Sequence, residues 1–135
     1  MGVLQLRAIA VEAERALARL SVRYGRLSDP ASSLSGGNQQ RLAIARELDR
    51  EPKLLVAAQP TRGVDIAGTA FIHSLIAVFR DRGGAVLLIS ESLDEILALS
   101  DRILGLYNGR IVGELGRNQA SLERVGRLML GQKAA

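Results

Sequence analysis

The most restrictive feature of this sequence is a set of three short apolar runs in which polar and apolar residues do not alternate. They span Leu54–Ala58, Ala85–Ile89 and Ile103–Tyr107. Strands covered on both faces of a parallel sheet have this character, whereas half-exposed strands alternate. Helical patterns separate the runs, over about Gly68–Arg82 and about Leu93–Leu99. This strand–helix–strand order predicts right-handed crossovers and an α/β fold.

Two further helices are expected before the first apolar run. From Leu4 to Leu20 apolar residues recur at helical spacing and charged residues fill the other side, which predicts an amphipathic surface helix. The next helix carries Leu42, Ala45 and Leu48 on one face and ends before Pro52.

The last third of the chain carries clear local signals. Ser92 with Glu95 fits a capping box at the start of the short helix. Asn108–Gly109 predicts a two-residue hairpin turn that returns through a strand over Arg110–Leu115. Ser121–Leu130 is expected to form a closing helix, so that one domain accounts for all 135 residues.

Composition excludes several classes of protein. Without cysteine the chain has no disulfide framework and no thiolate nucleophile or metal ligand. No apolar stretch approaches the roughly 18 residues that span a bilayer, and the N-terminus lacks a signal sequence. Its net charge is +4, but the arginines are scattered among acids and aromatic residues make up only 3%. Nucleic-acid binding is therefore not expected, and the cytoplasm is the default location.

The tetrapeptide Ser35-Gly36-Gly37-Asn38 opens the second expected helix. The first turn of a helix leaves N–H groups unpaired and carries partial positive charge. Two glycines would let a phosphate approach that backbone closely. Ser35 could either cap the helix or donate its hydroxyl to a phosphate oxygen. Taken alone, the tetrapeptide also fits a serine-capped helix after a glycine turn.

The longer string LSGGNQQRLAIAREL, followed by a buried strand and QPTRGVD, resembles the ATP-binding-cassette ATPases. More narrowly, it is similar to the second cassette of the tandem ATPases of sugar and nucleoside importers, in register from about Val3 to Leu115. The resemblance implies a partial P-loop NTPase (RecA-like) parallel sheet with flanking helices and a terminal β-hairpin. Residues 1–33 would be a remnant of the helical subdomain, 34–115 the signature loop and core, and 116–135 a C-terminal extension.

The resemblance also implies roles for individual residues. In the family, the serine and glycines of the signature contact the γ-phosphate of ATP held by the opposing cassette. The matching nucleotide-facing positions are Leu34, Ser35, Gly36, Gly37, Asn38 and Gln39. Asp65 matches the loop that crosses to the partner cassette, although it could also serve as a helix-start residue, and the two roles are compatible.

Several parts of the family's hydrolytic machinery are missing. No G-x-x-x-x-G-K-[ST] phosphate loop occurs in the sequence. Ala58 stands where relatives have a magnesium-associated aspartate, and Gln59 replaces the catalytic glutamate. Glu91 occupies the position of the switch histidine, where a negative charge would oppose developing anionic charge. No residue is therefore expected to be catalytically competent or to bind a metal, and the isolated chain is expected to be inactive.

The resemblance implies the C-terminal part of the ATP-binding subunit of a bacterial importer of the simple-sugar or nucleoside type, peripheral to the inner face of the cell membrane. ATP and Mg²⁺ would bind only in assembly with a cassette that carries a phosphate loop, and membrane permease subunits would be further partners. The alternative is a non-catalytic module that docks on a permease or cassette. We expect a truncated product or an excised fragment. Because the phosphate-loop strand between Ala85–Ile89 and Ile103–Tyr107 is absent, the isolated chain should rearrange, self-associate or have low stability.

Overall fold

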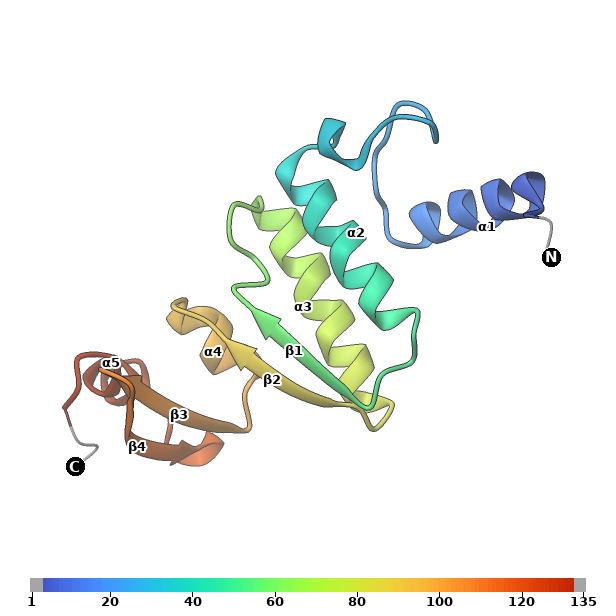
Figure 1. Ribbon diagram of the computed structural model, residues 1–135. Coiled ribbons are helices and arrows are strands. Elements are labelled where there is room, and N and C mark those ends of the chain that lie inside the picture. Colours follow the sequence, from blue (N-terminus) through green and yellow to red (C-terminus); the bar gives the residue numbers. More distant parts are fainter. Residues whose placement is uncertain (1–3, 133–135) are drawn as a thin grey trace. The chain divides into compact units, whose positions relative to one another are not determined.

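A computed structural model describes residues 4–132 of the chain (Figure 1). The chain forms two compact units, and the division passes through two strands. The first unit contains the residues up to Leu55 together with Pro60–Ala85, and the second contains Val56–Gln59 and the residues from Val86 onward. None of the described helices has the length and apolar character needed to cross a membrane.

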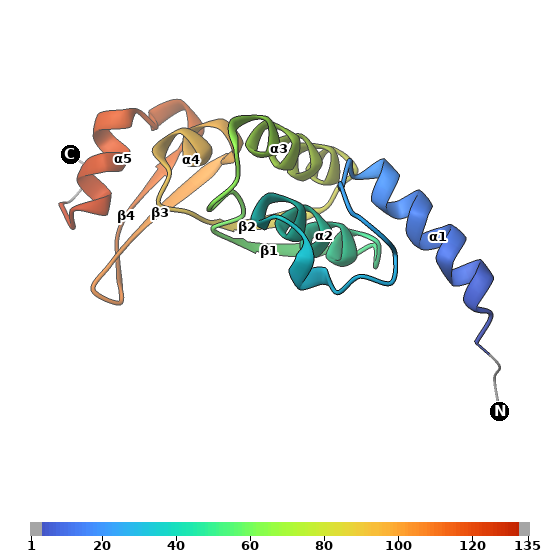
Figure 2. The same cartoon turned by 90° about the horizontal axis from the view of Figure 1, so that it is seen from above.

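Helices dominate the first unit: α1 (Leu6–Arg19), α2 (Gly36–Leu48) and α3 (Ile66–Asp81), with a short 3₁₀ helix at Ala31–Ser33. Helices α2 and α3 lie side by side in the views of Figures 1 and 2. The guanidinium of Arg41 on α2 lies 5.0 Å from the centre of the Phe71 ring on α3, a cation–π distance.

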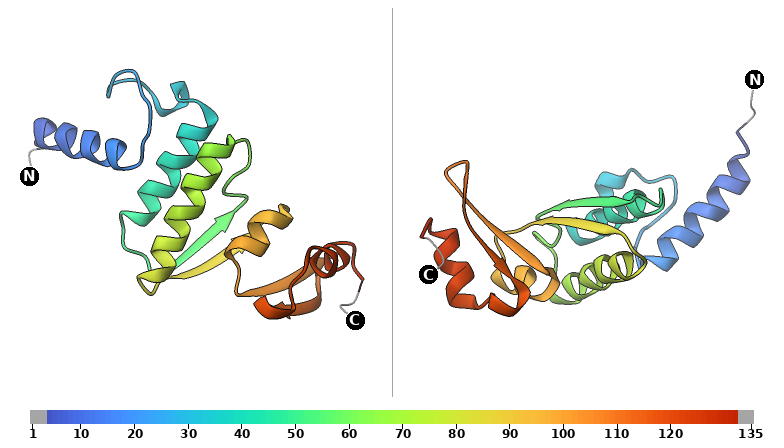
Figure 3. Two further views of the ribbon diagram at one scale, coloured as in Figure 1. Left: turned by 180° about the vertical axis from the view of Figure 1, so that it is seen from behind. Right: turned by 90° about the horizontal axis from the view of Figure 1, so that it is seen from below.

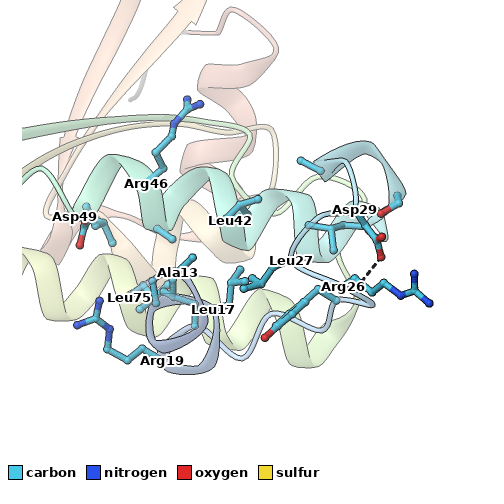
Figure 4. Close-up of a pocket in the computed structure, with 18 of the residues that line it drawn as sticks. Ala13, Leu17, Arg19, Arg26, Leu27, Asp29, Leu42, Arg46, Asp49 and Leu75 are labelled. Carbon is cyan, nitrogen blue, oxygen red and sulfur yellow. Dashed lines mark hydrogen bonds between the residues drawn. The ribbon is translucent and has the colours of Figure 1, made fainter. Parts of the chain in front are cut away.

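The buried side of these helices differs in part from the expected one. Ala45 is buried as predicted, but the second buried residue of α2 is Ile44, which the predicted face omits. Leu42 and Leu48 are only half-buried, because they face a cavity of about 640 Å³ beside α1. Figure 4 shows Leu42 and Leu27 among the side chains that line this cavity.

The amphipathic helix predicted at Leu4–Leu20 is confirmed, but its apolar side is poorly covered. None of the residues of α1 is buried, and Leu6 and Ile9 are 72% and 50% exposed. Ala13 and Leu17 from the same helix line the cavity (Figure 4). The apolar side of α1 therefore borders a hollow instead of a filled core.

Strands β1 (Leu54–Ala58) and β2 (Ala85–Ile89) form a two-stranded sheet, and both have the predicted bounds. The N–H of Ala85 donates to the carbonyl of Lys53 at 2.9 Å, and the N–H of Gln59 donates to that of Ile89 at 2.7 Å. The strands thus start together and end together, so they run parallel, as Figures 1 and 3 show.

Only one face of this sheet is covered among the described residues. Leu55 and Ala57 are buried, whereas the other three residues of β1 are exposed. About half the surface of four large apolar side chains is open to solvent: Leu54, Val56, Leu87 and Ile89. The expectation of coverage on both faces is wrong for the described chain. Parallel sheets are normally covered on both faces, so this face is an uncovered apolar surface.

The second unit adds α4 (Leu93–Leu99), β3 (Arg102–Tyr107), β4 (Arg110–Gly116) and α5 (Leu122–Met129). Strands β3 and β4 form an antiparallel hairpin in a sheet separate from that of β1 and β2. Both turn residues have positive φ, 47° at Asn108 and 73° at Gly109, which confirms the predicted two-residue turn. Helix α5 packs against β3 (Figure 2) around a core of Ile103, Leu115, Val125 and Leu128.

The predicted capping box at α4 forms only in part. Ser92 Oγ accepts a hydrogen bond from the N–H of Glu95 at 3.3 Å, as expected. The N–H of Ser92, however, donates to Ser90 Oγ at 3.0 Å. The reciprocal half of the box is therefore replaced by a hydroxyl two residues upstream.

Candidate functional site

The first turn of α2 lies at the surface and is not capped by its own serine. Ser35 occupies the N-cap position with extended backbone angles, yet its hydroxyl makes no capping hydrogen bond. The carbonyl of Ser35 accepts the first hydrogen bond of the helix, from the N–H of Gln39 at 2.9 Å. The N–H groups of Gly36, Gly37 and Asn38 have no partner within the helix, and this end carries partial positive charge. The serine-capped reading of the tetrapeptide is therefore wrong in its detail.

The two glycines are not required by the chain's own structure. Neither has a left-handed φ. A Cβ added at Gly36 would lie 3.9 Å from the carbonyl oxygen of Gly63, and one at Gly37 would lie 3.7 Å from Val64 Cγ1. Both distances are ordinary contacts. The glycines therefore relieve no internal strain. They leave the start of α2 free of side chains, which is what an anion needs in order to approach the backbone closely.

Side chains of the signature loop, Leu34–Gln39, form hydrogen bonds within the loop and with Arg23. Asn38 Oδ1 accepts from the N–H of Arg23 at 3.1 Å, and Asn38 Nδ2 donates to Ser35 Oγ at 3.0 Å. Gln39 Nε2 donates to the carbonyl of Leu34 at 2.7 Å. The structure thus brings the sequence-predicted residues together and adds Arg23, which the sequence reading missed.

Asp65 lies on the loop beside the same glycines. Its carboxylate accepts from the N–H of Gly68 at 2.6 Å and caps α3. Gly63 and Val64, immediately before it, are the residues that face Gly36 and Gly37. The helix-start role considered for Asp65 is confirmed, and the carboxylate remains exposed at the surface.

The second group of predicted positions lies at the carboxyl ends of β1 and β2. Gln59 has a φ of 49°, and its Oε1 accepts from the N–H of Glu91 at a long 3.5 Å. Ala58 is exposed at the last position of β1. Ligands of open α/β sheets bind at this end of the strands, so Gln59 and Glu91 meet at the end of the sheet where a ligand site is expected.

This second group is a poor match for a magnesium ion. Magnesium prefers carboxylate oxygens, but Ala58 offers no side-chain oxygen, Gln59 has only an amide, and Glu91 is the single carboxylate of the group. Across residues 4–132, no cluster of three or more histidine, aspartate or glutamate side chains could hold a metal. The signature loop and Asp65 belong to the first unit, whereas Ala58, Gln59 and Glu91 belong to the second.

Comparison with known proteins identifies the family of this chain. Residues 5–62 match the ABC transporter family. The chain is 49% identical, over 113 residues, to the ribose import ATP-binding protein RbsA 2 of Rubrobacter xylanophilus, a match that covers 84% of this chain and 22% of that protein. It is 42% identical, over 131 residues, to the guanosine import ATP-binding protein NupO of Bacillus subtilis, covering 97% of this chain and 26% of the relative.

The chain belongs to the ABC transporter ATPases. Its fold is part of the P-loop NTPase fold of ABC cassettes. A dimeric cassette bound to ADP and phosphate superposes with a TM-score of 0.71 at 26% identity, covering 86% of this chain and 50% of the cassette. Another ABC transporter cassette gives a TM-score of 0.70 at 26% identity, covering 96% of this chain and 53% of that one. The chain thus spans about half of a solved ABC cassette and about a quarter of its curated relatives.

Proposed function

We propose that this chain acts as the C-terminal part of the ATP-binding subunit of a simple-sugar or nucleoside importer. In this role its signature loop completes an ATP site whose phosphate loop belongs to another cassette. Its own nucleotide site is degenerate. The observation that carries the proposal is the exposed first turn of α2, where the Ser35 hydroxyl is not used to cap the helix.

The chain's own residues would act by electrostatic stabilisation and positioning. The N–H groups of Gly36, Gly37 and Asn38, together with the Ser35 hydroxyl, would donate to the γ-phosphate oxygens. Such donors are fixed before the reaction, so they need no reorganisation as charge develops on the transferred phosphoryl group. No proton is taken up by these groups. Their contribution is to bind, to orient and to exclude water.

The chain's own strand ends would contribute little to hydrolysis. Magnesium, where bound by the other cassette, neutralises charge on the phosphates. Gln59 can hydrogen-bond a water but is a very poor base, and loss of a general base forfeits roughly 10²–10⁴ in rate. The backbone N–H of Glu91 contacts Gln59 Oε1, and the carboxylate of the same residue would repel a phosphate that approached this strand end. Gln59 and Glu91 therefore support an asymmetric pair of ATP sites, in which only the site with the other cassette's phosphate loop hydrolyses ATP.

The proposed partners follow from the same role. Two of the relatives are named as import ATP-binding proteins for ribose and for guanosine. We infer that this chain works with a second cassette and with permease subunits at the inner face of the membrane. Asp65, exposed next to the signature loop, would contact the second cassette while it caps α3.

The test is a mixing experiment. The purified chain is titrated into a fixed amount of a cassette that retains its phosphate loop, and ATP hydrolysis is followed by phosphate release. We expect stimulation that saturates with added chain and is lost in Ser35→Arg, whose side chain fills the glycine-lined opening. Ser74→Arg is the matched control, because Ser74 lies on the exposed side of α3 in the same unit. Unchanged stimulation by Ser35→Arg would refute the assignment.

The alternative, a non-catalytic docking module, predicts a different result in this experiment. It predicts that the chain associates with the cassette or permease equally well without nucleotide and leaves ATP turnover unchanged.

A further inference from the structure

We propose that Asn38 and Arg41 are positioning residues that fasten the segment Ser21–Arg23 to α2 and thereby present the Ser35 hydroxyl as a hydrogen-bond donor. This inference rests on the proposed function of the signature loop. The segment Ser21–Arg23, which follows α1, is called the clamp segment below.

The orientation of the Asn38 amide group is fixed by its partners. A backbone N–H can only donate, so the atom of Asn38 that faces Arg23 N, at 3.1 Å, must be the carbonyl oxygen. The other end of the amide is then the NH₂ group, which lies 3.0 Å from Ser35 Oγ. Ser35 Oγ is therefore the acceptor in this contact.

This arrangement selects one of the two roles open to a hydroxyl. A serine can accept and donate, and a serine facing a phosphate is useful only as a donor. Asn38 Nδ2 occupies an acceptor site of Ser35 Oγ and polarises the hydroxyl, which strengthens its own donation. Among the described residues, no capping bond engages this hydroxyl either. Its proton is available for an incoming anion.

Arg41 holds the clamp segment one turn further along the same helix. Its Nη1 donates to the carbonyl of Ser21 at 2.9 Å, and its guanidinium rests 5.0 Å from the ring centre of Phe71. Between the two tethered positions, Val22 is buried with 6% of its surface exposed. All three residues of the clamp segment are thus held by contacts or by burial within the first unit.

The backbone of the clamp segment is held in an uncommon conformation. Ser21 has a φ of 51°, which is rare for residues other than glycine. Such a conformation persists where surrounding contacts over-determine it. The end of α1 supplies part of that constraint, because the N–H groups of Ser21 and Val22 donate to the carbonyls of Ala18 and Leu17, each at 3.0 Å. The bonds to Arg41 and Asn38 on either side of Val22 add to it and keep the Arg23 N–H aimed at Asn38.

Asn38→Asp separates the two contacts of Asn38, which accepts a hydrogen bond from Arg23 and donates one to Ser35. The carboxylate still accepts from the Arg23 N–H, so the clamp segment stays in place and the Arg23 amide keeps its protection from hydrogen exchange. It cannot donate to Ser35. It instead accepts the hydrogen bond from the Ser35 hydroxyl that the phosphate would otherwise accept. We expect stimulation of the partner cassette's ATPase to fall at least about tenfold, the loss expected for one hydrogen bond to a charged group. Asn118→Asp, an exposed site in the other unit, is the matched control.

A double-mutant cycle asks whether Asn38 acts through Ser35. Asn38→Ala should lower stimulation about tenfold in the unmodified chain but less than about threefold in the Ser35→Ala background, because the hydroxyl that it orients is already gone. Arg41→Lys should keep the charge but speed hydrogen exchange of the Arg23 amide severalfold, since lysine lacks the planar fork. Arg46→Lys on the same helix serves as its control.

The outcomes separate this inference from the proposed function. If Ser35→Ala lowers stimulation but the Asn38 effects are absent or simply additive with it, the positioning role is overturned and the signature assignment stands. If the unmodified chain never stimulates a cassette that holds ATP, the proposed function fails and the positioning role fails with it.

Discussion

Gly68→Ala is a sharp test of the packing that supports the signature loop. Gly68 is buried in the first turn of α3. A Cβ there would lie 2.4 Å from Val64 Cγ1, 3.0 Å from Asp65 Oδ1 and 3.3 Å from Arg41 Nη2. The same Val64 methyl group faces Gly37, so the substitution presses on the residues that support the start of α2.

The expected magnitude follows from two opposed effects. Replacing glycine by alanine inside a helix normally stabilises by about 1 kcal/mol. Overpacking costs about 1–3 kcal/mol, and the 2.4 Å approach to a short, stiff valine side chain places this site at the upper end. Displacing the Asp65 carboxylate weakens a cap worth about 1 kcal/mol. We expect a net loss of about 2 kcal/mol in the free energy of unfolding.

Urea denaturation followed by helical circular dichroism measures this effect. With a slope of about 2 kcal/mol per molar urea, Gly68→Ala should lower the midpoint by about 1 M. Gly126→Ala is the matched control, because Gly126 lies inside α5 with no atom within 4 Å of an added Cβ. It should raise stability by about 0.5–1 kcal/mol. If Gly68→Ala matched or exceeded the stability of the unmodified chain, the packing account of this loop would be wrong.

Three further outcomes are expected. Gln59→Glu alone should leave the isolated chain without ATPase activity, since neither a phosphate loop nor a magnesium ligand is restored; measurable phosphate release would contradict this. Asp65→Ala should lower stability by about 0.5–2 kcal/mol in the same urea assay, and an unchanged midpoint would refute its capping role. The unmodified chain should self-associate at high concentration through its uncovered sheet face, and Leu87→Lys should reduce the mass seen by light scattering. A monomer with a high, cooperative melting transition would contradict this.

The parts of the fold that were predictable from sequence are those set by local chemistry. Strands β1 and β2 have the expected bounds because each is a short apolar run between breakers. The turn at Asn108–Gly109 forms because asparagine and glycine tolerate the positive φ that a two-residue hairpin needs. Asp65 caps α3 for an equally local reason, a carboxylate three residues from the N–H that it accepts.

The parts that were not predictable depend on residues far apart in the chain. Asn38 contacts Arg23 across 15 positions and Arg41 contacts Ser21 across 20, and no periodic pattern links such pairs. The sequence left Ser35 a choice between capping α2 and donating to a phosphate. The structure shows no capping bond, and the contact from Asn38 Nδ2 supports the proposed donor role. The exposure of one face of the β1–β2 sheet was not predictable from the apolar runs themselves, because such a run has the same sequence pattern whether or not a neighbour covers it.

In the proposed function, the bare first turn of α2 recognises the terminal phosphate of a nucleotide held by another cassette. The most direct test of this recognition is the affinity of the chain for a hydrolysis-deficient cassette that retains its phosphate loop, measured by calorimetric titration in ATP and in ADP. We predict binding at least about tenfold tighter with ATP, with that difference lost in Ser35→Arg. Equal affinity of the chain for the cassette in the presence of ATP and of ADP, unchanged by Ser35→Arg, would refute this recognition.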